Sequence, residues 1–462
     1  MPSEAPATRS LPGVFSRDYL WTTIGSCALV FLGAFESLAV TTVMPVVSAE
    51  LHGASLYALA FAGPLATGVI GMVIAGNWSD RNGPVAPLYT SAVLFMAGLI
   101  IAGTASQMST LVTGRLVQGL GSGAIIVALY VVVARVFPAR LHPSIFAGFA
   151  AAWVVPSLIG PFAAGAVAEI WSWHWVFLGV VGLIIAAMGM VVPVMRRLEV
   201  GGADGGGTPA TPWAIGRIVW AIVAAAAVLS LDLLSGVPAI GGILAIAAAI
   251  LTVVAVRPLL PAGTLLARGG LPSVILLRGL AAAAFFGAEV YLPYLLVRRY
   301  DFTPTLAGLA LTLAAIAWAS ASWLQGRMSV SLTHTMSTVI GGSLVLVGIL
   351  TAFATSLLAL PPAVAIVGWA LGGGGMGLMY PRISVMTLAL STSENQGFNS
   401  SALSIADSLG GALALSTTGL VFAALSFSGV FAFTAIIALL AITVAPRVAR
   451  GAPEAALRDA SG

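Results

Sequence analysis

The chain has 462 residues, of which 59% are hydrophobic and only 7% are charged. A soluble domain carries roughly a quarter charged residues, so this chain lacks the polar side chains needed to cover a water-soluble globule. Its apolar runs are repeatedly long enough to cross the roughly 30 Å hydrocarbon core of a bilayer. We therefore predict an all-α integral membrane protein that crosses the bilayer many times.

The composition also excludes several classes of function. All nineteen basic residues are arginines, so the chain has no Walker A lysine with which to bind ATP. No basic tract suits nucleic acid. Cys27 is the single cysteine and the four histidines fall singly in different connections, which argues against disulfides and metal sites. We expect no cofactor, no metal, no nucleic acid partner and no enzymatic activity.

Apolar runs and their polar interruptions give the expected spans in chain order. Six spans are expected at about 20–47, 55–76, 87–104, 108–134, 144–168 and 174–195. A flexible linker follows at 201–209, and then a helical hairpin of two spans within 215–256, with its turn at 235–238. Six further spans are expected at about 272–297, 304–325, 335–356, 361–386, 398–421 and 427–446.

This pattern divides the chain into three parts and gives them an orientation. Residues 1–200 and 271–462 each hold six spans, and residues 201–270 hold the linker and the inserted pair. Arginines accumulate in connections that stay in the cytoplasm. With both termini inside, fifteen of the nineteen arginines lie on the inner side. We expect a protein of the plasma membrane whose first span is an uncleaved insertion signal, working as a monomer.

A charged turn at 76–84 joins the second and third spans and has the form Gly-x-x-x-Asp-Arg-x-Gly. The positions that match are Gly76, Asp80, Arg81 and Gly83. This turn resembles the signature loop of the major facilitator superfamily, although Pro84 stands where the family usually has a basic residue. We expect Asp80 to lie near a helix start and to accept backbone N–H groups or pair with an arginine, so that the turn clasps the cytoplasmic side shut.

Two further stretches resemble the drug:proton antiporter branch of that family. Residues 115–123 in the fourth span are similar to Arg-x-x-x-Gly-x-Gly, and Arg115 and Gln118 share one helical face. In the fifth span, Pro156, Gly160, Pro161 and Gly165 lie in a stretch similar to the antiporter motif Gly-x-x-x-Gly-Pro-x-x-Gly-Gly. Pro156 and Ala164 depart from that motif. Close helix packing by small residues is the alternative explanation.

The resemblance implies the architecture of the 14-span antiporters. That architecture is a major facilitator fold of two six-helix bundles, with an inserted two-helix hairpin between them. Its proton-exchanging acid in the first span corresponds here to Glu36, because the stretch around it resembles that part of the branch.

Acidic residues inside a span are costly and usually functional, so they are candidates for the chemistry. Glu36 lies in the first span among Phe35, Leu38 and Val40. Apolar surroundings disfavour its charged form, which suits a carboxyl that exchanges protons near neutral pH. Arg115 is the expected partner, because the first and fourth spans are neighbours in the fold that the resemblance implies.

Glu289 in the seventh span is the second candidate. It shares a face with Phe285 and Phe286, and an acid with aromatic walls suits lipophilic cations. A structural pair with an arginine or a hydroxyl is the alternative for this acid and for the others.

Asp407 in the eleventh span is the third candidate. It shares a stripe with Ser400 and Ser404 that would admit water. Asp232 belongs to the inserted hairpin and is expected to lie off the central pathway.

The tenth span contains four consecutive glycines, Gly372, Gly373, Gly374 and Gly375. Each weakens a helix by roughly 1 kcal/mol relative to alanine, so this span should bend or pack very closely. We expect a flexible gate, with tight packing alone as the alternative.

Together these features predict a proton-coupled exporter of lipophilic or cationic small molecules that works by alternating access. Its expected partners are protons, the small-molecule substrate and the lipid bilayer. Export of lipids or glycolipids, import, and a non-transporting membrane sensor or scaffold are the alternatives.

Overall fold

The computed structural model describes residues 13–17, 19–138, 141–203, 213–235, 241–327, 333–392 and 395–449, and within these every regular element is helical. The first six long helices are α1 (Leu20–Glu50), α2 (Leu59–Asn82), α3 (Val85–Gly103), α4 (Met108–Val136), α5 (His142–Ile170) and α6 (His174–Ala203). A pair follows, α7 (Ile215–Ser235) and α8 (Gly241–Val256). The last set is α9 (Leu271–Glu289), α10 (Tyr291–Tyr300), α11 (Pro304–Arg327), α12 (His334–Leu358), α13 (Pro362–Ala389) and α14 (Gln396–Val444). Single turns η1 (Ala54–Leu56), η3 (Arg257–Leu259), η4 (Thr264–Leu266) and η5 (Ala445–Arg447) lie between or after them.

The described residues contain twelve helical segments that are long and apolar enough to cross a membrane. The helices α9 and α10 form one of these segments, because the chain is interrupted only at Val290. The sequence predicted a continuous helix there. The stretch that includes α14 and η5 counts as one segment of 50 residues, and the apolar stretch Ile215–Leu231 within α7 is shorter than the twelve.

The helix α14 is two helices joined at Ser426, whose φ of 56° and ψ of −156° are not helical. Its first part lies beside the start of α9, because Asp407 contacts Arg278. The turn η5, which follows α14 directly, lies at the start of α9 too, because the N–H of Gly270 donates to the carbonyl oxygen of Arg447 at 3.1 Å. Both ends of α14 therefore lie at one end of the molecule, and the chain reverses near Ser426.

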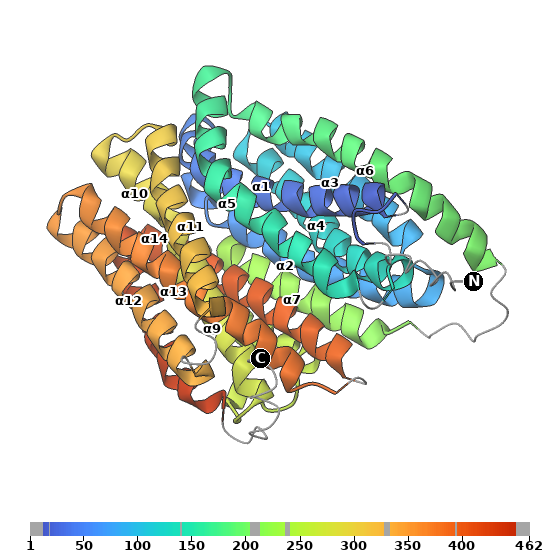
Figure 1. Cartoon of the computed structure of the whole chain (residues 1–462). Helices are drawn as coiled ribbons and strands as arrows, with labels where there is room; N and C mark the ends of the chain where they lie inside the picture. Colours follow the sequence, from blue (N-terminus) through green and yellow to red (C-terminus); the bar gives the residue numbers. More distant parts are fainter. Residues whose placement is uncertain are drawn as a thin grey trace, which may run out of the picture.

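The same packing pattern occurs twice in the chain. Among the first six helices, α4 packs on α2 and α3, and α1 packs on α5. Among the last set, α13 packs on α11 and α12, and α9 packs on α14. Figure 1 shows the blue to green helices α1 to α6 on one side and the yellow to red helices α9 to α14 on the other. We call the two sets the N bundle and the C bundle.

The two bundles meet along two helix pairs, α5 with α11 and α2 with α14. The helices α7 and α8 pack on each other, and α7 also packs on α2 and α14. At the α5–α11 contact a Cβ on Gly308 would lie 2.5 Å from the carbonyl oxygen of Pro161. Only glycine allows this approach, so the bundles are in backbone contact there.

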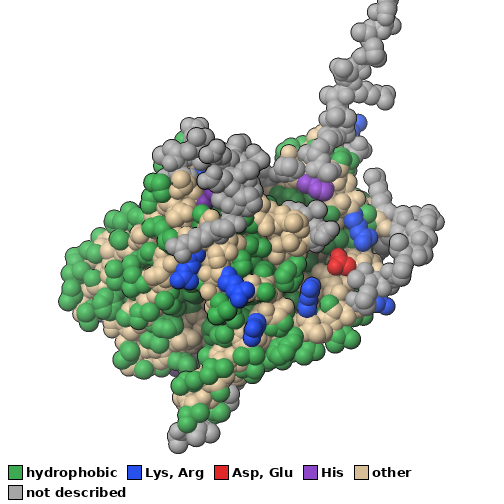
Figure 2. All heavy atoms as spheres, turned by 90° about the horizontal axis from the view of Figure 1, so that it is seen from below, with side chains coloured by type: hydrophobic (Ala, Val, Ile, Leu, Met, Phe, Trp, Pro, Cys, Tyr) green, Lys and Arg blue, Asp and Glu red, His purple; other side chains and the backbone are tan. Residues whose placement is uncertain are grey.

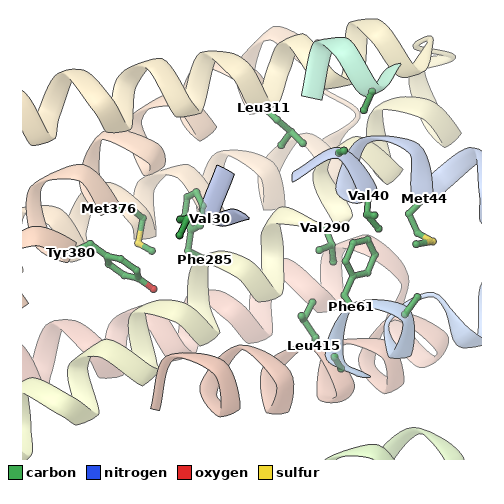
Figure 3. Close-up of a cluster of buried hydrophobic side chains, with 14 of the residues drawn as sticks. Val30, Val40, Met44, Phe61, Phe285, Val290, Leu311, Met376, Tyr380 and Leu415 are labelled. Atoms are coloured by element: carbon green, nitrogen blue, oxygen red, sulfur yellow. The ribbon is translucent and has the colours of Figure 1, made fainter. Parts of the chain in front are cut away.

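A continuous buried cluster of hydrophobic side chains runs through both bundles. Figure 3 shows Phe285, Met376 and Tyr380 at one end of the part drawn, and Phe61 beside Val290 at the other. On the surface, hydrophobic side chains cover much of the flanks, and the face in Figure 2 carries more basic than acidic side chains. An apolar surface of this extent is the one that lipid requires.

Some predicted features fall outside the described residues. The helix α6 runs to Ala203, so the first three residues of the predicted linker are helical, and residues 204–209 lie outside the described part. Residues 236–238 of the hairpin turn also lie outside it, as does the side chain of Asp232.

For orientation we name the two ends of the molecule by residues. The Tyr57 end contains the last turn of α1 and the first turn of α2. The Arg135 end contains the last turns of α2 and α4. The distribution of arginines predicts that the Tyr57 end faces outward.

Candidate functional site

A buried polar cluster lies between α1 and α4 in the N bundle. Arg115 Nη1 donates to Glu36 Oε1 and, at 2.7 Å, to Gln118 Oε1. Arg115 Nε donates to the carbonyl oxygen of Ala60 on α2 at 3.1 Å. Glu36 is 3% exposed and Arg115 is 4% exposed. The structure shows the pairing that the sequence predicted, and it adds Gln118 and the α2 backbone as partners.

Glycines on α4 hold Arg115 in this position. A Cβ on Gly123 would lie 2.1 Å from the carbonyl oxygen of Gly68 on α2, and one on Gly121 would lie 2.4 Å from the nitrogen of Phe95 on α3. The helix therefore touches the backbones of two neighbours just after Arg115. The glycines of the Arg-x-x-x-Gly-x-Gly stretch fix the depth and rotation of α4, which directs the guanidinium toward Glu36.

A second ion pair lies in the C bundle, and the sequence predicted only one of its members. Arg278 Nε donates to Asp407 Oδ1 at 2.7 Å, and Nη2 donates to Oδ2 at 3.4 Å. The hydroxyl of Tyr380 donates to the same Oδ1 at 2.8 Å. The guanidinium of Arg278 lies over the ring of Tyr380, 3.6 Å from its centroid. The only sequence signal for Arg278 was an arginine inside a span.

Glu289 lies at the last position of α9, next to the break at Val290. No hydrogen bond or ion pair joins its carboxyl to another described residue, although it interacts electrostatically with Tyr380. The aromatic side chain one turn earlier, Phe285, is buried and stacks on Trp369 with ring centroids 4.8 Å apart. The three candidate acids therefore lie in three different environments, although Asp407 and Glu289 both interact with Tyr380.

The charged turn contacts its own bundle and the chain before α7. Asp80 is exposed in the last turn of α2, so the expectation of a helix start was wrong. Gly83 has a φ of 83°, and a Cβ there would lie 3.1 Å from Arg135 Nη1. Arg135 Nη2 lies 3.4 Å from the Ser79 carbonyl oxygen, and Arg81 lies 6.0 Å from the ring centroid of Trp213. A Cβ added at Gly76 would contact only a side chain of α4.

The antiporter-like stretch of α5 lies at the contact between the bundles. Gly308 of α11 packs closely on Pro161. A Cβ on Gly165 would lie 2.8 Å from Thr305 Cα, which also belongs to α11. Gly160 faces the ring of Phe35 on α1, the neighbour of Glu36, and Pro156 is buried one turn earlier. These residues therefore serve close packing: Pro161 and Gly165 pack against the other bundle, whereas Gly160 packs against α1 of its own bundle.

Three of the four consecutive glycines of α13 are in close contact with neighbouring helices. A Cβ on Gly373 would lie 2.2 Å from the Ala314 carbonyl oxygen, and one on Gly375 would lie 2.4 Å from the Gly341 carbonyl oxygen. Gly372 approaches the backbone of α12, whereas Gly374 has only one atom within 4 Å, at 3.9 Å. The helix is unbroken from Pro362 to Ala389 in this structure. A gate at these glycines stays a prediction.

Among the described residues, no group of three or more His, Cys, Asp or Glu side chains lies together in a way that could hold a metal ion. Two bundles of repeated packing, with charged residues paired inside the membrane-spanning helices, are the features of a transporter. The sequence comparison decides the family. Residues 26–366 match the family model described as the Major Facilitator Superfamily.

The chain belongs to the major facilitator superfamily. It is a multi-pass membrane transporter and not an enzyme. Among curated relatives, it is 24% identical to the multidrug efflux pump SdrM of Staphylococcus aureus over 79% of this chain and 81% of that protein. It is 28% identical to a protein of Mycobacterium tuberculosis named a probable multidrug-efflux transporter, over 84% of each chain.

Other relatives match over a shorter stretch. An uncharacterized MFS-type transporter of Schizosaccharomyces pombe is 35% identical over 149 residues, which is 32% of this chain and only 25% of that protein. Among solved structures, a POT family transporter in complex with a thioalcohol conjugated peptide has a TM-score of 0.69 at 14% identity, covering 92% of this chain and 97% of that one. A mutant of the peptide transporter POT in complex with sulfate has a TM-score of 0.67 at 15% identity, covering 95% and 96%. These similarities establish the fold.

Proposed function

We propose that this transporter is a proton-coupled exporter of lipophilic or cationic small molecules. The observation that carries the proposal is the buried cluster of Glu36, Arg115 and Gln118 between α1 and α4. A buried ion pair seldom stabilises a protein more than apolar packing does, so its presence favours a functional role. The multidrug efflux relatives over most of the chain support the substrate class.

In this mechanism the bundles rock against each other and expose a central cavity to one side at a time. A proton from outside neutralises Glu36 or Glu289, which releases the substrate outward, and loss of the proton to the cytoplasm resets the carrier. Arg115 holds Glu36 charged until the proton arrives, because an opposite charge nearby favours the ionised carboxyl. Glu289 lacks such a partner among the described residues, so its carboxylate is available to bind a cationic substrate.

We further propose fourteen crossings, with both termini in the cytoplasm of a cell whose plasma membrane holds the protein. A helix of 49 residues would be about 73 Å long, more than twice the roughly 30 Å hydrocarbon core. The reversal near Ser426 divides α14 into two crossings, and α7, which is not one of the twelve segments, supplies the fourteenth. Residues 1–200 and 271–462 then form the two bundles, with residues 201–270 inserted between them.

The proposal is tested by transport in inverted membrane vesicles with an imposed pH gradient and a lipophilic cationic dye. Glu36→Gln and Glu289→Gln each remove one titrating carboxyl while keeping its shape. We expect Glu36→Gln to abolish pH-driven efflux and Glu289→Gln to weaken efflux of the cationic dye more than that of a neutral one. Asp301→Asn, an exposed acid between α10 and α11, is the matched control. Wild-type rates in both test variants would refute the mechanism.

A second candidate, export of lipids or glycolipids, is favoured by an apolar groove of about 220 Å³ between α1, α5 and α6. The groove is lined by Phe35, Ala164, Trp171, Trp175 and Leu183 among others, and the two tryptophans are 73% and 56% exposed. Tryptophan is typical of the membrane interface, and exposed tryptophans at the groove would let a lipid enter it from the side. Lipid retained by the purified protein, compared with dye efflux, separates the two candidates.

A further inference from the structure

The first helix of the inserted hairpin contacts both bundles at once. The helix α7 packs on α2 of the N bundle and on α14 of the C bundle, and Figure 1 shows α7 next to α2. A buried apolar cluster joins the three helices. Among its members, each at most 3% exposed, are Ala66 and Val69 of α2, Ala224 and Val228 of α7, and Ala402 and Ile405 of α14. The hairpin is therefore part of the seam between the bundles.

The start of α7 extends this contact to the Arg135 end. The N–H of Ala214 donates to Asn77 Oδ1 at 3.2 Å, and Asn77 lies in the last two turns of α2. Three residues later, the guanidinium carbon of Arg217 lies 5.0 Å from the centre of the Phe398 ring, in the first turn of α14. We call residues 213–217 the bridging turn, because they join the end of α2 to the start of α14.

The bridging turn is too short to follow a large change in the spacing of the bundles. Three residues of a helix rise only about 4.5 Å along its axis. The N–H groups of Arg217 and Ile218 both donate to the Ala214 carbonyl oxygen, which holds these residues in a helical turn. When the bundles rock, the distance between the end of α2 and the start of α14 changes. The bridging turn therefore keeps both of its contacts only over a narrow range of spacings.

Both contacts form in the conformation that is closed at the Tyr57 end. There the hydroxyl of Tyr57 on the N bundle donates to the carbonyl oxygen of Val290 on the C bundle at 2.7 Å. A contact that forms in only one of two conformations shifts the population toward that conformation. The bridging turn therefore favours the state closed at the Tyr57 end.

We propose that the inserted hairpin regulates alternating access, because its bridging turn connects the bundles at the Arg135 end and stabilises the conformation closed at the Tyr57 end. The charged turn takes part in this connection, since Arg81 lies 6.0 Å from the ring centroid of Trp213. The proposal rests on the rocking of the bundles in the proposed function, and it is independent of proton coupling and of the substrate.

The test measures the spacing of the bundles at both ends with pairs of spin labels, using the full chain in lipid nanodiscs and a Cys27→Ser background. Labels at Asn82 and Thr392 report the Arg135 end, and labels at Ser55 and Leu358 report the Tyr57 end; all four positions are exposed. Arg217→Gln removes the cation over the Phe398 ring. We expect the ratio of molecules open to molecules closed at the Tyr57 end to rise roughly two- to fivefold. The distance at the Arg135 end should gain a shorter component at the same time.

Further variants assign the shift to the bridging turn. Arg217→Lys keeps a cation over the ring and should behave as wild type, as should Arg268→Gln, at an exposed arginine near the start of α9. Asn77→Ala removes the attachment to α2 and should shift the populations in the same direction as Arg217→Gln. The two attachments act in series, so the double variant should shift the ratio by less than the product of the two single shifts. Two unconnected contacts would multiply.

Unchanged distances at both ends in Arg217→Gln and Asn77→Ala would overturn the proposal. A change at the Arg135 end alone would also overturn it, because that result means local loosening of α7 without rocking of the bundles. These outcomes can be told apart from a failure of the proposed export. If the distances stay unchanged while Glu36→Gln abolishes pH-driven dye efflux, the role of the hairpin fails and the transport mechanism stands.

Discussion

Arg115 bonds to three partners. Replacing it should therefore reveal the coupling free energy between the members of the N-bundle cluster. Arg115→Met would leave the carboxylate of Glu36 buried without a charge partner, and we expect a loss of about 3–5 kcal/mol in stability. Adding Glu36→Gln should restore part of that loss, because the amide is neutral. Thermal unfolding of the purified single and double variants measures the coupling. Arg298→Met is the exposed control, and strictly additive losses would contradict this account of the cluster.

At the same scale, the sequence predicted one ion pair and missed the other. Glu36 and Arg115 could be paired because the resemblance placed their spans side by side. Arg278 and Asp407 are 129 positions apart in the chain, and nothing in a hydropathy pattern fixes the rotation of one helix against another. The stripe of Ser400 and Ser404 predicted water beside Asp407, and that prediction gave no reason to place a guanidinium there. A rule that every intramembrane arginine needs an anion would have suggested the pair.

The helix α13 allows a prediction at the scale of an element, because adjacent glycines face different surroundings. Gly373→Ala places a Cβ 2.2 Å from the Ala314 carbonyl oxygen of α11, so the helices must separate and both stability and transport should fall. Gly374→Ala meets nothing closer than 3.9 Å and should be tolerated, or stabilise the helix by up to about 1 kcal/mol. Melting temperatures and efflux rates of the two variants test this. Equal effects would show that flexibility rather than close packing selects these glycines.

The helices themselves were largely predictable, because a span needs about 20 apolar residues whatever it packs against. The interruption at Val290 was not predicted, although Pro293 is a signal for it, because a proline has no N–H to donate to the carbonyl oxygen of Glu289 four residues earlier. The reversal of α14 was anticipated as the gap between two predicted spans, but the conformation of Ser426 has no counterpart in the pattern. Tertiary contacts decide such positions, and a single sequence does not contain them explicitly.

At the scale of the whole molecule, the Tyr57 end is held closed by contacts between the bundles. The hydroxyl of Tyr57 donates to the Val290 carbonyl oxygen at 2.7 Å, and its ring stacks on Tyr294 with centroids 4.6 Å apart. Tyr57→Phe keeps the ring and removes this hydrogen bond, so we expect a larger population open at that end. Tyr300→Phe is the matched control, because Tyr300 donates to the Leu360 carbonyl oxygen within one bundle.

Spin labels placed at Ser55 and Leu358, in a Cys27→Ser background, report the separation of the bundles at that end. The distance distribution should gain a longer component in Tyr57→Phe and stay unchanged in Tyr300→Phe. An unchanged distribution in both variants would show that the tyrosine bond does not contribute to closure.

The contacts at the Tyr57 end also determine how much free energy is needed to open that end during transport. Besides the Tyr57 bond, the Thr305 N–H donates to Glu169 Oε1 across the bundles at 2.8 Å. Net contributions of such bonds are about 1 kcal/mol each, somewhat more when one partner is charged. A difference of one pH unit corresponds to about 1.4 kcal/mol per proton. In the proton-coupled mechanism that we propose, the polar part of the closure is matched to what one or two pH units would supply, and a lock of many buried ion pairs would be too strong for that drive to open.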